Sequence, residues 1–585
     1  MASVPAVRQI DTDILILGAG GAGLFAALHA KKAAPDLDVT IAVKGLLGKC
    51  GCTRMVQGGY NVALAPGDSV ERHFMDTIEG GKWLNNQDLA WKLVVEAQVR
   101  IRELENELGC FFDRNPDGSV HQKAFAGQTF DRTVHKGDLT GIEIINRLSE
   151  QVWRRNVRRL EDYRALDLIP AADGSGLAGV LMLDMRTGEP TFVRARATLL
   201  ATGGGPTMYK YHTPSGDKTC DGLAMALRGG LTLRDLEMVQ FHPTGLLAGA
   251  GTRMTGTVLE EGLRGAGGYL LDSRGERFMF DYDQRGERAT RDIVSRSIMY
   301  QIRKGFATKN GGVHIQMSHL GPANVRRMFK GMVQRCADCG FDLAGERVEV
   351  VPTAHYMMGG VVFDLDCRTA MPRLYAAGED TGGVHGANRL GGNGVANSTV
   401  FGGVAGDAMA QAVAREGTHA DPDQGVIARA LDRAFSPIGR PSGDLPEIRE
   451  SLMETMWNDV GILRTGEGLA RAATALDGLA AAVMQCGVPE GDRRYNLTWM
   501  DRLNLENLIL VSRAVCAAAI ARTDSRGAHF REDHPTTSEL ETSRYTVVRM
   551  RDEQIDIGTE PVAFTRVVPG QTLIKDEPPA LHAAS

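Results

Sequence analysis

The sequence predicts an α/β fold. Three apolar runs, 14–17, 197–200 and 374–377, have the length of short buried strands, and each leads into a glycine turn. Such strands are typical of a parallel, doubly wound sheet that binds a nucleotide. The stretch 241–352 lacks this pattern, and from about residue 421 apolar residues recur at helical spacing. We therefore expect four parts: a Rossmann-like nucleotide-binding domain, 1–240 and 353–410; an inserted α+β capping domain, 241–352; a helical domain, 421–529; and a C-terminal domain or tail, 530–585.

The segment after the first strand fits the pattern G-x-G-x-x-G without a gap. Gly18 permits the tight turn, Gly20 lets a pyrophosphate approach the backbone, and Gly23 lets the following helix pack close to the strand. The free N–H groups at the start of that helix then face the phosphates. We expect a dinucleotide in contact with Gly18, Ala19, Gly20, Gly21, Ala22 and Gly23.

The second strand, Val39–Val43, ends in Lys44, where a carboxylate would hold the adenosine ribose of NAD. This argues against plain NAD binding. Three glycine-ended strands spread over the chain suit a large, extended cofactor such as FAD, whereas a compact nicotinamide site needs only the first. We expect FAD, with further contacts at the ends of these strands: Lys44, Ala201, Thr202, Gly203 and Glu379.

Length and composition exclude several other classes. A chain of 585 residues should hold two to four domains, and its net charge of -6 with no basic block disfavours nucleic acid. Nine cysteines form no disulfide-like framework, which suits a reducing, cytoplasmic compartment. The pair Cys336 and Cys339 is weak evidence for a metal, and none is expected. We expect no signal peptide and no direct membrane span, because no segment has about 20 unbroken apolar residues.

The segment from Cys52 to Gly59 closely resembles one family: the flavoprotein subunits of succinate dehydrogenase and fumarate reductase, with L-aspartate oxidase as a cousin. The family pattern is His-Thr or Ser-Thr, three residues, then Gln-Gly-Gly; here Cys52 replaces the histidine that carries FAD covalently. The resemblance spans about 12–533 and implies non-covalent FAD, a cysteinyl link being the alternative. It places at the cofactor Cys52, Thr53, Gln57, Gly58, Gly59, Asp221, Gly394 and Val395.

Four further motifs match the family in order and supply groups for a carboxylate substrate. Hydride exchange with a C–C bond needs the substrate clamped by cations and a proton donor beside it. The resemblance makes His242, His355 and Arg389 the carboxylate-binding groups and Arg291 the proton donor, which Glu261 and Asp292 would refill. His121 and His135 lie in a polar loop that approaches the flavin in the family, and we expect them to be structural.

Glu260 is a departure, because it stands where the family has a threonine that donates to a substrate carboxylate. An ionised glutamate would repel that carboxylate. Three explanations remain open: Glu260 points away, Glu260 is protonated, or the substrate carries a donor group instead. A second departure is Gly394-Val395-Ala396, where the respiratory enzymes commonly have Ser-Leu-Leu.

The resemblance implies a catalytic flavoprotein subunit that interconverts succinate and fumarate. Electrons would be exchanged with an iron–sulfur subunit, which would pass them to membrane anchor subunits and quinone at the inner face of the plasma membrane. The missing histidine favours the reductase direction. The alternatives are a free-standing enzyme like L-aspartate oxidase, a reductase of another α,β-unsaturated acid, and a non-catalytic FAD-binding assembly subunit.

Overall fold

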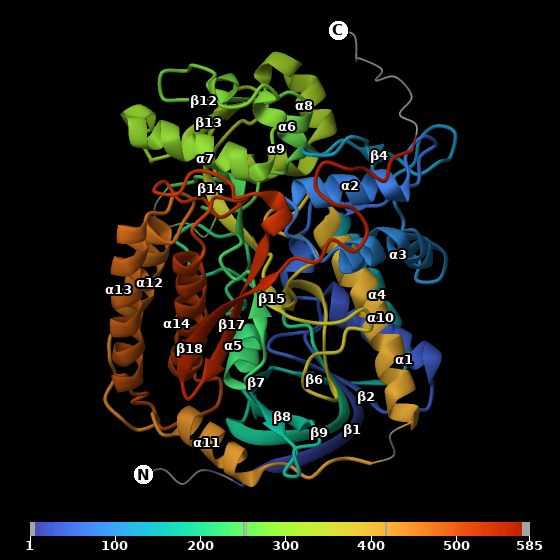
Figure 1. Ribbon diagram of the computed structural model, residues 1–585, viewed down its shortest axis with the longest axis vertical. Helices are drawn as coiled ribbons and strands as arrows, with labels where there is room; N and C mark the ends of the chain where they lie inside the picture. The colour runs from blue at the N-terminus through green and yellow to red at the C-terminus, as the bar shows by residue number, and fades with distance from the viewer. Residues whose placement is uncertain (1–5, 250–251, 253, 416–417, 576–585) are drawn as a thin grey trace.

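The predicted glycine-ended strands lie side by side in the computed structural model, which describes residues 6–249, 252, 254–415 and 418–575 (Figure 1). Strand β1 (Arg8–Leu17) pairs in parallel with β2 (Val39–Val43) and with β9 (Glu189–Leu200). Beyond these, β6 (Val157–Glu161) pairs in parallel with β2, and β16 (Leu374–Ala376) with the last residues of β9. The carboxyl ends of β1, β9 and β16 therefore meet at one edge of the sheet.

Antiparallel strands extend this sheet beyond β9. Strand β7 (Tyr163–Pro170) pairs with β8 (Leu177–Asp184), and β8 pairs with the first half of β9. The sheet order is β6-β2-β1-β9-β8-β7, with β16 paired to β9. The sheet is thus mixed, parallel where the three glycine turns meet and antiparallel at one side.

Both faces of the sheet are buried, as the unbroken apolar run of β1 predicts. Successive side chains of a strand point to opposite faces. Ile14 and Ile16 accordingly join one apolar core and Leu15 and Leu17 another. The first core is completed by four helices: α1 (Gly21–Ala33), α3 (Gln87–Asn106), α4 (Thr140–Arg154) and α10 (Asn393–Arg415).

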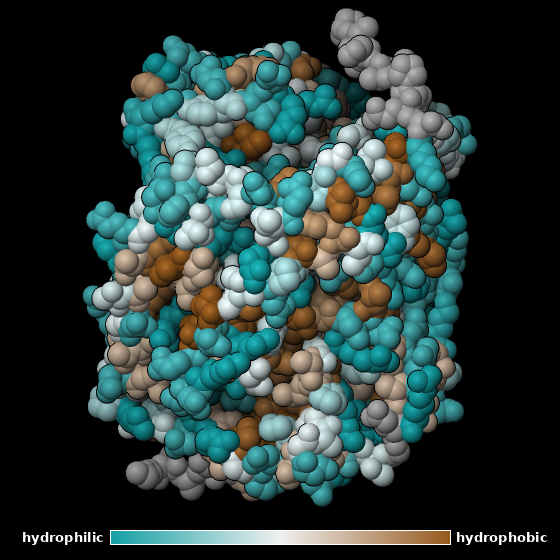
Figure 2. Space-filling model, in the orientation of Figure 1, coloured by the Kyte–Doolittle hydropathy of each residue, from teal (hydrophilic) through white to brown (hydrophobic). Residues whose placement is uncertain are grey.

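The stretch between β9 and β16 includes a separate lobe at one end of the molecule, at the top of Figure 1, which we call the cap, residues 239–357. It holds an antiparallel sheet in the order β11 (Val239–Leu246), β14 (Arg347–Met357), β13 (Val313–Gln316) and β12 (Tyr269–Leu271). Its helices are α6 (Gly262–Gly265), α7 (Arg291–Gln301), α8 (Pro322–Met328) and α9 (Lys330–Ala337). The cap has its own apolar core, and the outline of the molecule narrows beneath it (Figure 2).

Helices follow the nucleotide-binding part, as the sequence predicts. They are α11 (Gln424–Phe435), α12 (Leu445–Asp459), α13 (Gly466–Gln485) and α14 (Leu497–Ala521). By length and composition α14 could cross a membrane, with a mean hydropathy of 1.5 over its most apolar window, but 67% of that window is buried. Leu505, Leu508 and Val515 on α14 are fully buried in the core that also holds α5 (Asp221–Arg228). The apolar character of α14 is therefore that of a core helix.

The predicted β-leaning tail forms a hairpin of β17 (Arg544–Arg551) and β18 (Gln554–Pro561). The hairpin adds to β10 (Leu233–Arg234), which pairs in turn with β15 (Gly360–Val361). Because β10 precedes the cap and β15 follows it, the C-terminal hairpin fixes the two strands through which the chain enters and leaves the cap. The last part of the predicted tail, 576–585, lies outside the described residues.

Candidate active site

A cavity of about 660 Å³ begins at the meeting point of the three strand ends and reaches the cap. Most of the residues predicted to bind cofactor line it: Gly20, Gly21, Ala22, Cys52, Thr53, Gln57, Gly58, Gly59, Ala201, Gly203, Glu379, Gly394 and Val395. The residues predicted at the substrate line it too: His242, Glu260, Glu261, Arg291, His355 and Arg389. The two sets, hundreds of residues apart in the chain, therefore share one space.

The glycine turn after β1 is built for close approach. Gly18 has a φ of +109°, and a Cβ there would lie 2.2 Å from the carbonyl oxygen of Ala201; a Cβ at Gly23 would lie 2.0 Å from that of Gly18. Gly20, the residue before α1, has no side chain that could cap the helix. The amide of Gly21 donates to Oγ1 of Thr53 at 3.0 Å. The start of α1 thus presents backbone donors and a positive dipole end to the cavity, which fits the pyrophosphate of FAD.

Glu379 and Thr202 lie at the ends of β16 and β9. Oε1 of Glu379 accepts from the amide of Met357 at 3.0 Å and the side chain lines the cavity, while Oγ1 of Thr202 donates to Asp380 at 3.0 Å. Thr202 thus stays off the cavity lining. Lys218, which the sequence analysis missed, lines the cavity and comes from the polar segment that also holds Asp221.

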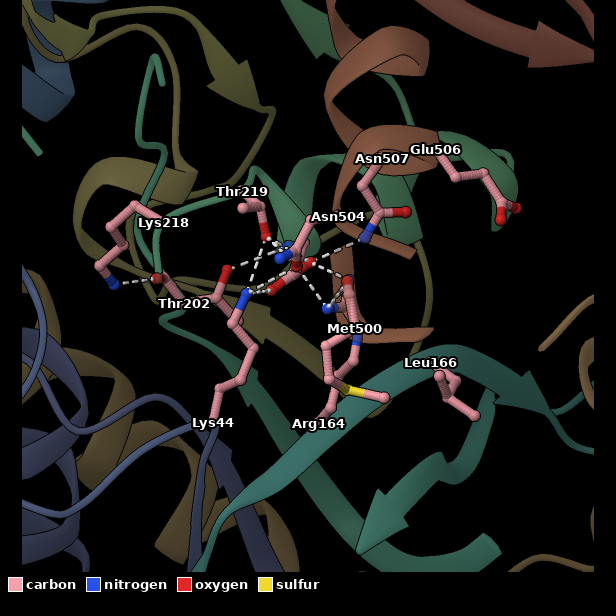
Figure 3. A network of polar contacts seen from close by, with 12 residues as sticks. Lys44, Arg164, Leu166, Thr202, Lys218, Thr219, Met500, Asn504, Glu506 and Asn507 are labelled. Carbon is pink, nitrogen blue, oxygen red and sulfur yellow. Dashed lines mark hydrogen bonds and ion pairs between the residues drawn. The ribbon is translucent and has the colours of Figure 1, made fainter. Parts of the chain in front are cut away.

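Lys44 and Asp221 are paired with each other and lie outside the cavity lining. Nζ of Lys44 donates to Asp221 Oδ2 at 2.8 Å, and Nη2 of Arg164 donates to Oδ1 at 3.0 Å. Burial opposes ionisation of Asp221, but Lys44 and Arg164 outweigh it and lower its pKa. Figure 3 shows Lys44 and Arg164 pointing toward Asn504 of α14, so this network joins strands, α5 and α14. The structure does not bring either predicted cofactor contact to the cavity.

Cys52 begins a single 3-10 turn, η1 (Cys52–Met55), and lines the cavity. Burial, together with the nearby Glu379, raises the pKa of its thiol to about 12. The thiolate is the nucleophilic form of cysteine. Cys52 is therefore held in the unreactive state at neutral pH.

Arg291, at the first position of α7, is bound to two other buried side chains. Its Nε and Nη2 donate to Oε2 of Glu261 at 3.1 and 2.6 Å, and its Nη1 donates to Oε1 of Gln240 at 3.0 Å. The same oxygen of Gln240 accepts from Nη2 of Arg389 at 3.0 Å. Gln240, which the sequence analysis did not select, thus bridges the two arginines. Asp292 pairs instead with Arg296 at 3.5 Å and lies outside the cavity lining.

Arg389 carries an unused donor. Its Nη1 donates to the carbonyl of Leu390 at 3.3 Å, its guanidinium lies 4.4 Å from the ring centre of Tyr356, and its buried Nε has no hydrogen-bond partner among the described residues. Burial, and then Arg291, lower the pKa of Arg389 to about 10, so it remains a cation. A buried donor without a partner requires an explanation, such as a bound water or ligand, and Arg389 lines the cavity.

His242 and His355 both line the cavity, and their ring centres lie 5.4 Å apart. Nδ1 of His355 lies 2.8 Å from Oγ1 of Thr213. Burial, and then the nearby Arg291, lower the pKa of both histidines well below the usual value. Both are therefore neutral rings that line the cavity and can donate or accept a hydrogen bond.

Glu260 does not point away from the cavity. Its Oε2 accepts from Nζ of Lys123 at 3.1 Å, across the seam between the cap and strand β4 (Gln122–Lys123). Burial raises the pKa of Glu260, and Lys123 opposes this. The carboxylate thus has a cationic partner, and Arg335 of α9 lines the cavity beside it.

His121 and His135 bond to each other, Nδ1 to Nε2 at 2.6 Å, away from the cavity lining. Cys336 is buried on α9 and Cys339 is half-buried just after it, and neither lines the cavity. Among the described residues no group of three or more His, Cys, Asp or Glu side chains has the arrangement of a metal site.

Comparison with known proteins decides the family. The family described as FAD binding domain matches residues 13–395, and the one described as fumarate reductase flavoprotein C-term matches 449–574. The chain belongs to the fumarate reductase and succinate dehydrogenase flavoproteins. One component of the fumarate reductase (CoM/CoB) of Methanothermobacter marburgensis is 41% identical over 90% of this chain and 95% of its own length. The fumarate reductase flavoprotein subunit of Escherichia coli is 33% identical over 91% and 90%.

Solved flavoprotein structures agree with this assignment. A quinol fumarate reductase variant from E. coli superimposes with a TM-score of 0.91 at 30% identity, covering 97% of this chain and 99% of that one. An adenylylsulfate reductase of Archaeoglobus fulgidus, at 16% identity and a TM-score of 0.77, shares the fold alone. The predicted fold class, the FAD cofactor and the class of enzyme are confirmed: this flavoprotein is an FAD-dependent oxidoreductase that acts on a CH–CH group.

Proposed function

We propose that this flavoprotein is the catalytic subunit of a fumarate reductase or succinate dehydrogenase complex and interconverts succinate and fumarate. The observation that carries the proposal is the buried pair of Arg291 and Glu261 beside Arg389 in one cavity. A cation without a carboxylate partner suits a substrate carboxylate, and an arginine held by a glutamate suits proton delivery.

Each of these residues has a separate part in the proposed reaction. FAD, when bound along the cavity, supplies the hydride acceptor or donor. Arg389 holds one substrate carboxylate through its guanidinium, and the neutral His242 and His355 add hydrogen bonds that draw charge from the double bond. In fumarate reduction Arg291 releases a proton from its guanidinium to the substrate carbon that receives no hydride. The Glu261 carboxylate, whose Oε2 lies 2.6 Å from Nη2 of Arg291, then takes up a proton from solvent and passes it to the deprotonated guanidine.

The proposal extends to partners. We propose that electrons pass to an iron–sulfur subunit, which relays them to membrane anchor subunits and quinone at the inner face of the plasma membrane. Similar flavoproteins support this, among them the 8-methylmenaquinol:fumarate reductase flavoprotein subunit of Wolinella succinogenes, which is 34% identical over 95% of this chain. Co-purification of the flavoprotein with an iron–sulfur protein from its native host would test it, and a flavoprotein that purifies alone and fully active with a physiological quinone pool would contradict it.

We also propose that FAD is held without a covalent bond, because the Cys52 thiol stays protonated. Acid denaturation should then release all the flavin, and mass spectrometry should give the mass of the bare chain. A flavin adduct on the peptide that contains Cys52 would contradict this.

We propose that the enzyme works mainly in the direction of fumarate reduction. Redox titration of the bound flavin tests this direction, and a flavin potential well above that of the fumarate/succinate couple would contradict it.

Dye-linked turnover by the purified holoprotein tests the substrate. Fumarate with reduced viologen and succinate with an oxidised dye should both be turned over, faster than L-aspartate or monocarboxylic enoates. Rapid peroxide production from L-aspartate, with neither fumarate nor succinate turned over, would favour the aspartate oxidase alternative, which the loss of the histidine at position 52 keeps open. Turnover of another enoate alone would favour a reductase of that acid.

A further inference from the structure

Arg335 is a cavity-lining cation with no part in the relay of Arg291 and Glu261. It lies on α9 of the cap, with a half-exposed side chain. Its Nη1 donates to the carbonyl oxygen of Val258 at 2.8 Å, and the amide oxygen of Gln57, in the orientation that its neighbours require, accepts from the same guanidinium. Both acceptors are neutral, so neither cancels the charge of Arg335.

No carboxylate among the described residues lies within the 4.0 Å that defines an ion pair with Arg335. Arg291 differs, because its guanidinium is bound to Glu261. Arg389 resembles Arg335, because it too has only neutral oxygens as hydrogen-bond acceptors. Lys49, Arg54, Lys218, Arg335 and Arg389 line the cavity without an ion pair among the described residues, and Arg335 is the one of them that belongs to the cap.

Two acids lie near Arg335, Glu260 and Asp138; both line the cavity, and neither is within ion-pair distance of it. Oε2 of Glu260 is held by Lys123 at 3.1 Å, so the two charges cancel locally. The carboxylate of Asp138 lies against the first turn of α9, where a Cβ on Gly331 would be 2.0 Å from its Oδ2. The dipole of a helix favours an anion at this position. Arg335 thus stays outside ion-pair distance of every described carboxylate, on the side of the cavity where Glu260 lies.

We propose that Arg335 binds the second carboxylate of the substrate, on the Glu260 side of the cavity, while Arg389 binds the first. This rests on the proposed function. A guanidinium gives a carboxylate two charge-assisted hydrogen bonds, which are stronger than one from a hydroxyl. The assignment explains how a dicarboxylate is accepted although Glu260 lines the same wall: Lys123 neutralises Glu260, and Arg335 supplies the attraction.

The test compares two arginine variants in the holoenzyme, Arg335→Gln and Arg327→Gln. Arg327 lies on α8 of the cap, is exposed, donates to Oδ1 of Asn324 at 2.7 Å and does not line the cavity, which makes it a matched control. KM and kcat are measured for fumarate and for crotonate, which lacks the second carboxylate, and binding of malonate is measured by calorimetry. We expect R335Q to raise the KM for fumarate and the Kd for malonate about 10- to 100-fold. Its KM for crotonate and every constant of R327Q should change less than about threefold, and R335K should recover part of the loss.

A rise in both the fumarate and crotonate KM of R335Q would assign Arg335 a role in packing the cap and overturn the inference. An unchanged fumarate KM and malonate Kd would overturn it as well. These outcomes leave the proposed function standing, provided that the wild-type enzyme turns over fumarate. A wild-type enzyme that neither turns over fumarate or succinate nor binds malonate would overturn both. If R335Q does not accumulate as a folded holoprotein, the same constants are compared between R335K and the wild type. A fumarate KM and a malonate Kd that do not rise in R335K would then overturn the inference.

Discussion

Oε2 of Glu261 accepts two hydrogen bonds from Arg291, from Nε at 3.1 Å and from Nη2 at 2.6 Å, and both side chains are buried. Burial opposes ionisation of Glu261, but Arg291 and Arg264 outweigh it and lower its pKa. An arginine loses a proton only in the moment of transfer. In the proposed mechanism Glu261, which touches the same nitrogen, takes up a proton from solvent and restores the guanidinium.

Glu261→Gln keeps the size of the side chain and removes its capacity to carry a proton. We expect kcat for fumarate reduction to fall on the order of 10²- to 10⁴-fold, the usual contribution of a positioned acid–base group. Glu276→Gln, also in the cap and paired with Arg274 at 2.7 Å on the surface, is the control and should keep full activity. If the E261Q and E276Q enzymes were equally active, Glu261 would have no part in proton transfer.

Lys123→Met should weaken substrate binding without touching the relay. It removes the cation that opposes the effect of burial, so the pKa of Glu260 rises further, and above that pKa the unpaired carboxylate repels a dicarboxylate. At alkaline pH, where Glu260 is ionised, we expect the KM for fumarate to rise about tenfold, with kcat little changed, and Glu260→Gln in the same chain to restore it. Lys136→Met, which removes a half-exposed lysine paired with Asp113 at 3.3 Å, is the control. A K123M enzyme with wild-type KM would show that the charge of Glu260 does not reach the substrate.

Two helical glycines should respond in opposite ways to alanine. A Cβ on Gly402 of α10 would lie 2.5 Å from the carbonyl oxygen of Ala22, whereas one on Gly478 of α13 would meet nothing within 4 Å. We expect G402A to lose about 1–3 kcal/mol of stability and to retain less FAD, because α1 must move. G478A should gain about 0.5–1 kcal/mol. Chemical denaturation and flavin content measure both; a G402A protein as stable and flavin-replete as G478A would contradict the close packing of α1 and α10.

The buried neutral histidines make stability depend on pH. Burial lowers the pKa of His242, His355 and His385, so the folded chain leaves them unprotonated where the unfolded chain protonates them, below about pH 6.5. The unfolded state then binds more protons, and the free energy of unfolding falls as pH drops through 6.5. Each such histidine contributes roughly 1.4 kcal/mol per pH unit. His29, whose pKa its carboxylate partners raise against the effect of burial, works in the opposite direction.

Denaturation of the holoprotein at pH 7.5 and 5.5 measures this dependence. His385→Gln removes one of the neutral rings and should flatten the slope by about one proton. An unchanged slope in H385Q, or stability independent of pH over this interval, would show that these rings take up protons in the folded protein.

The sequence was most informative where chemistry is local. The turn from Gly18 to Gly23 is specified by glycine alone, so its geometry could be predicted, and the strand ends at Ala201 and Glu379 carried the same signal. The shared cavity followed from strand order, since parallel strands end at one edge. The hairpin at 544–561 could be predicted as β structure, but not its pairing with β10, because pairing partners depend on the tertiary fold.

Other parts of the site depended on contacts that no local pattern records. Lys44 and Asp221 are 177 positions apart, and only the tertiary fold brings the residue after β2 to the start of α5. Asp292 follows Arg291 in sequence, but neighbouring residues of a helix do not share a face, so it cannot serve the same cavity. Arg335 has the local pattern of an ordinary charged residue of a surface helix, and only the fold of the cap brings it to the cavity.

The most direct measurement is the reoxidation of dithionite-reduced holoprotein by fumarate, followed by stopped-flow flavin absorbance in the wild type and in Arg291→Gln. The account predicts fast, saturable reoxidation of the wild type. It predicts that R291Q binds FAD normally but is reoxidised at least 10³-fold more slowly, because no group delivers the proton. R285Q, which removes an exposed cap arginine paired with Asp283 at 2.9 Å, should behave as the wild type. Unimpaired reoxidation of R291Q would show that another group donates the proton, and a wild type that fumarate does not reoxidise would contradict the proposed function itself.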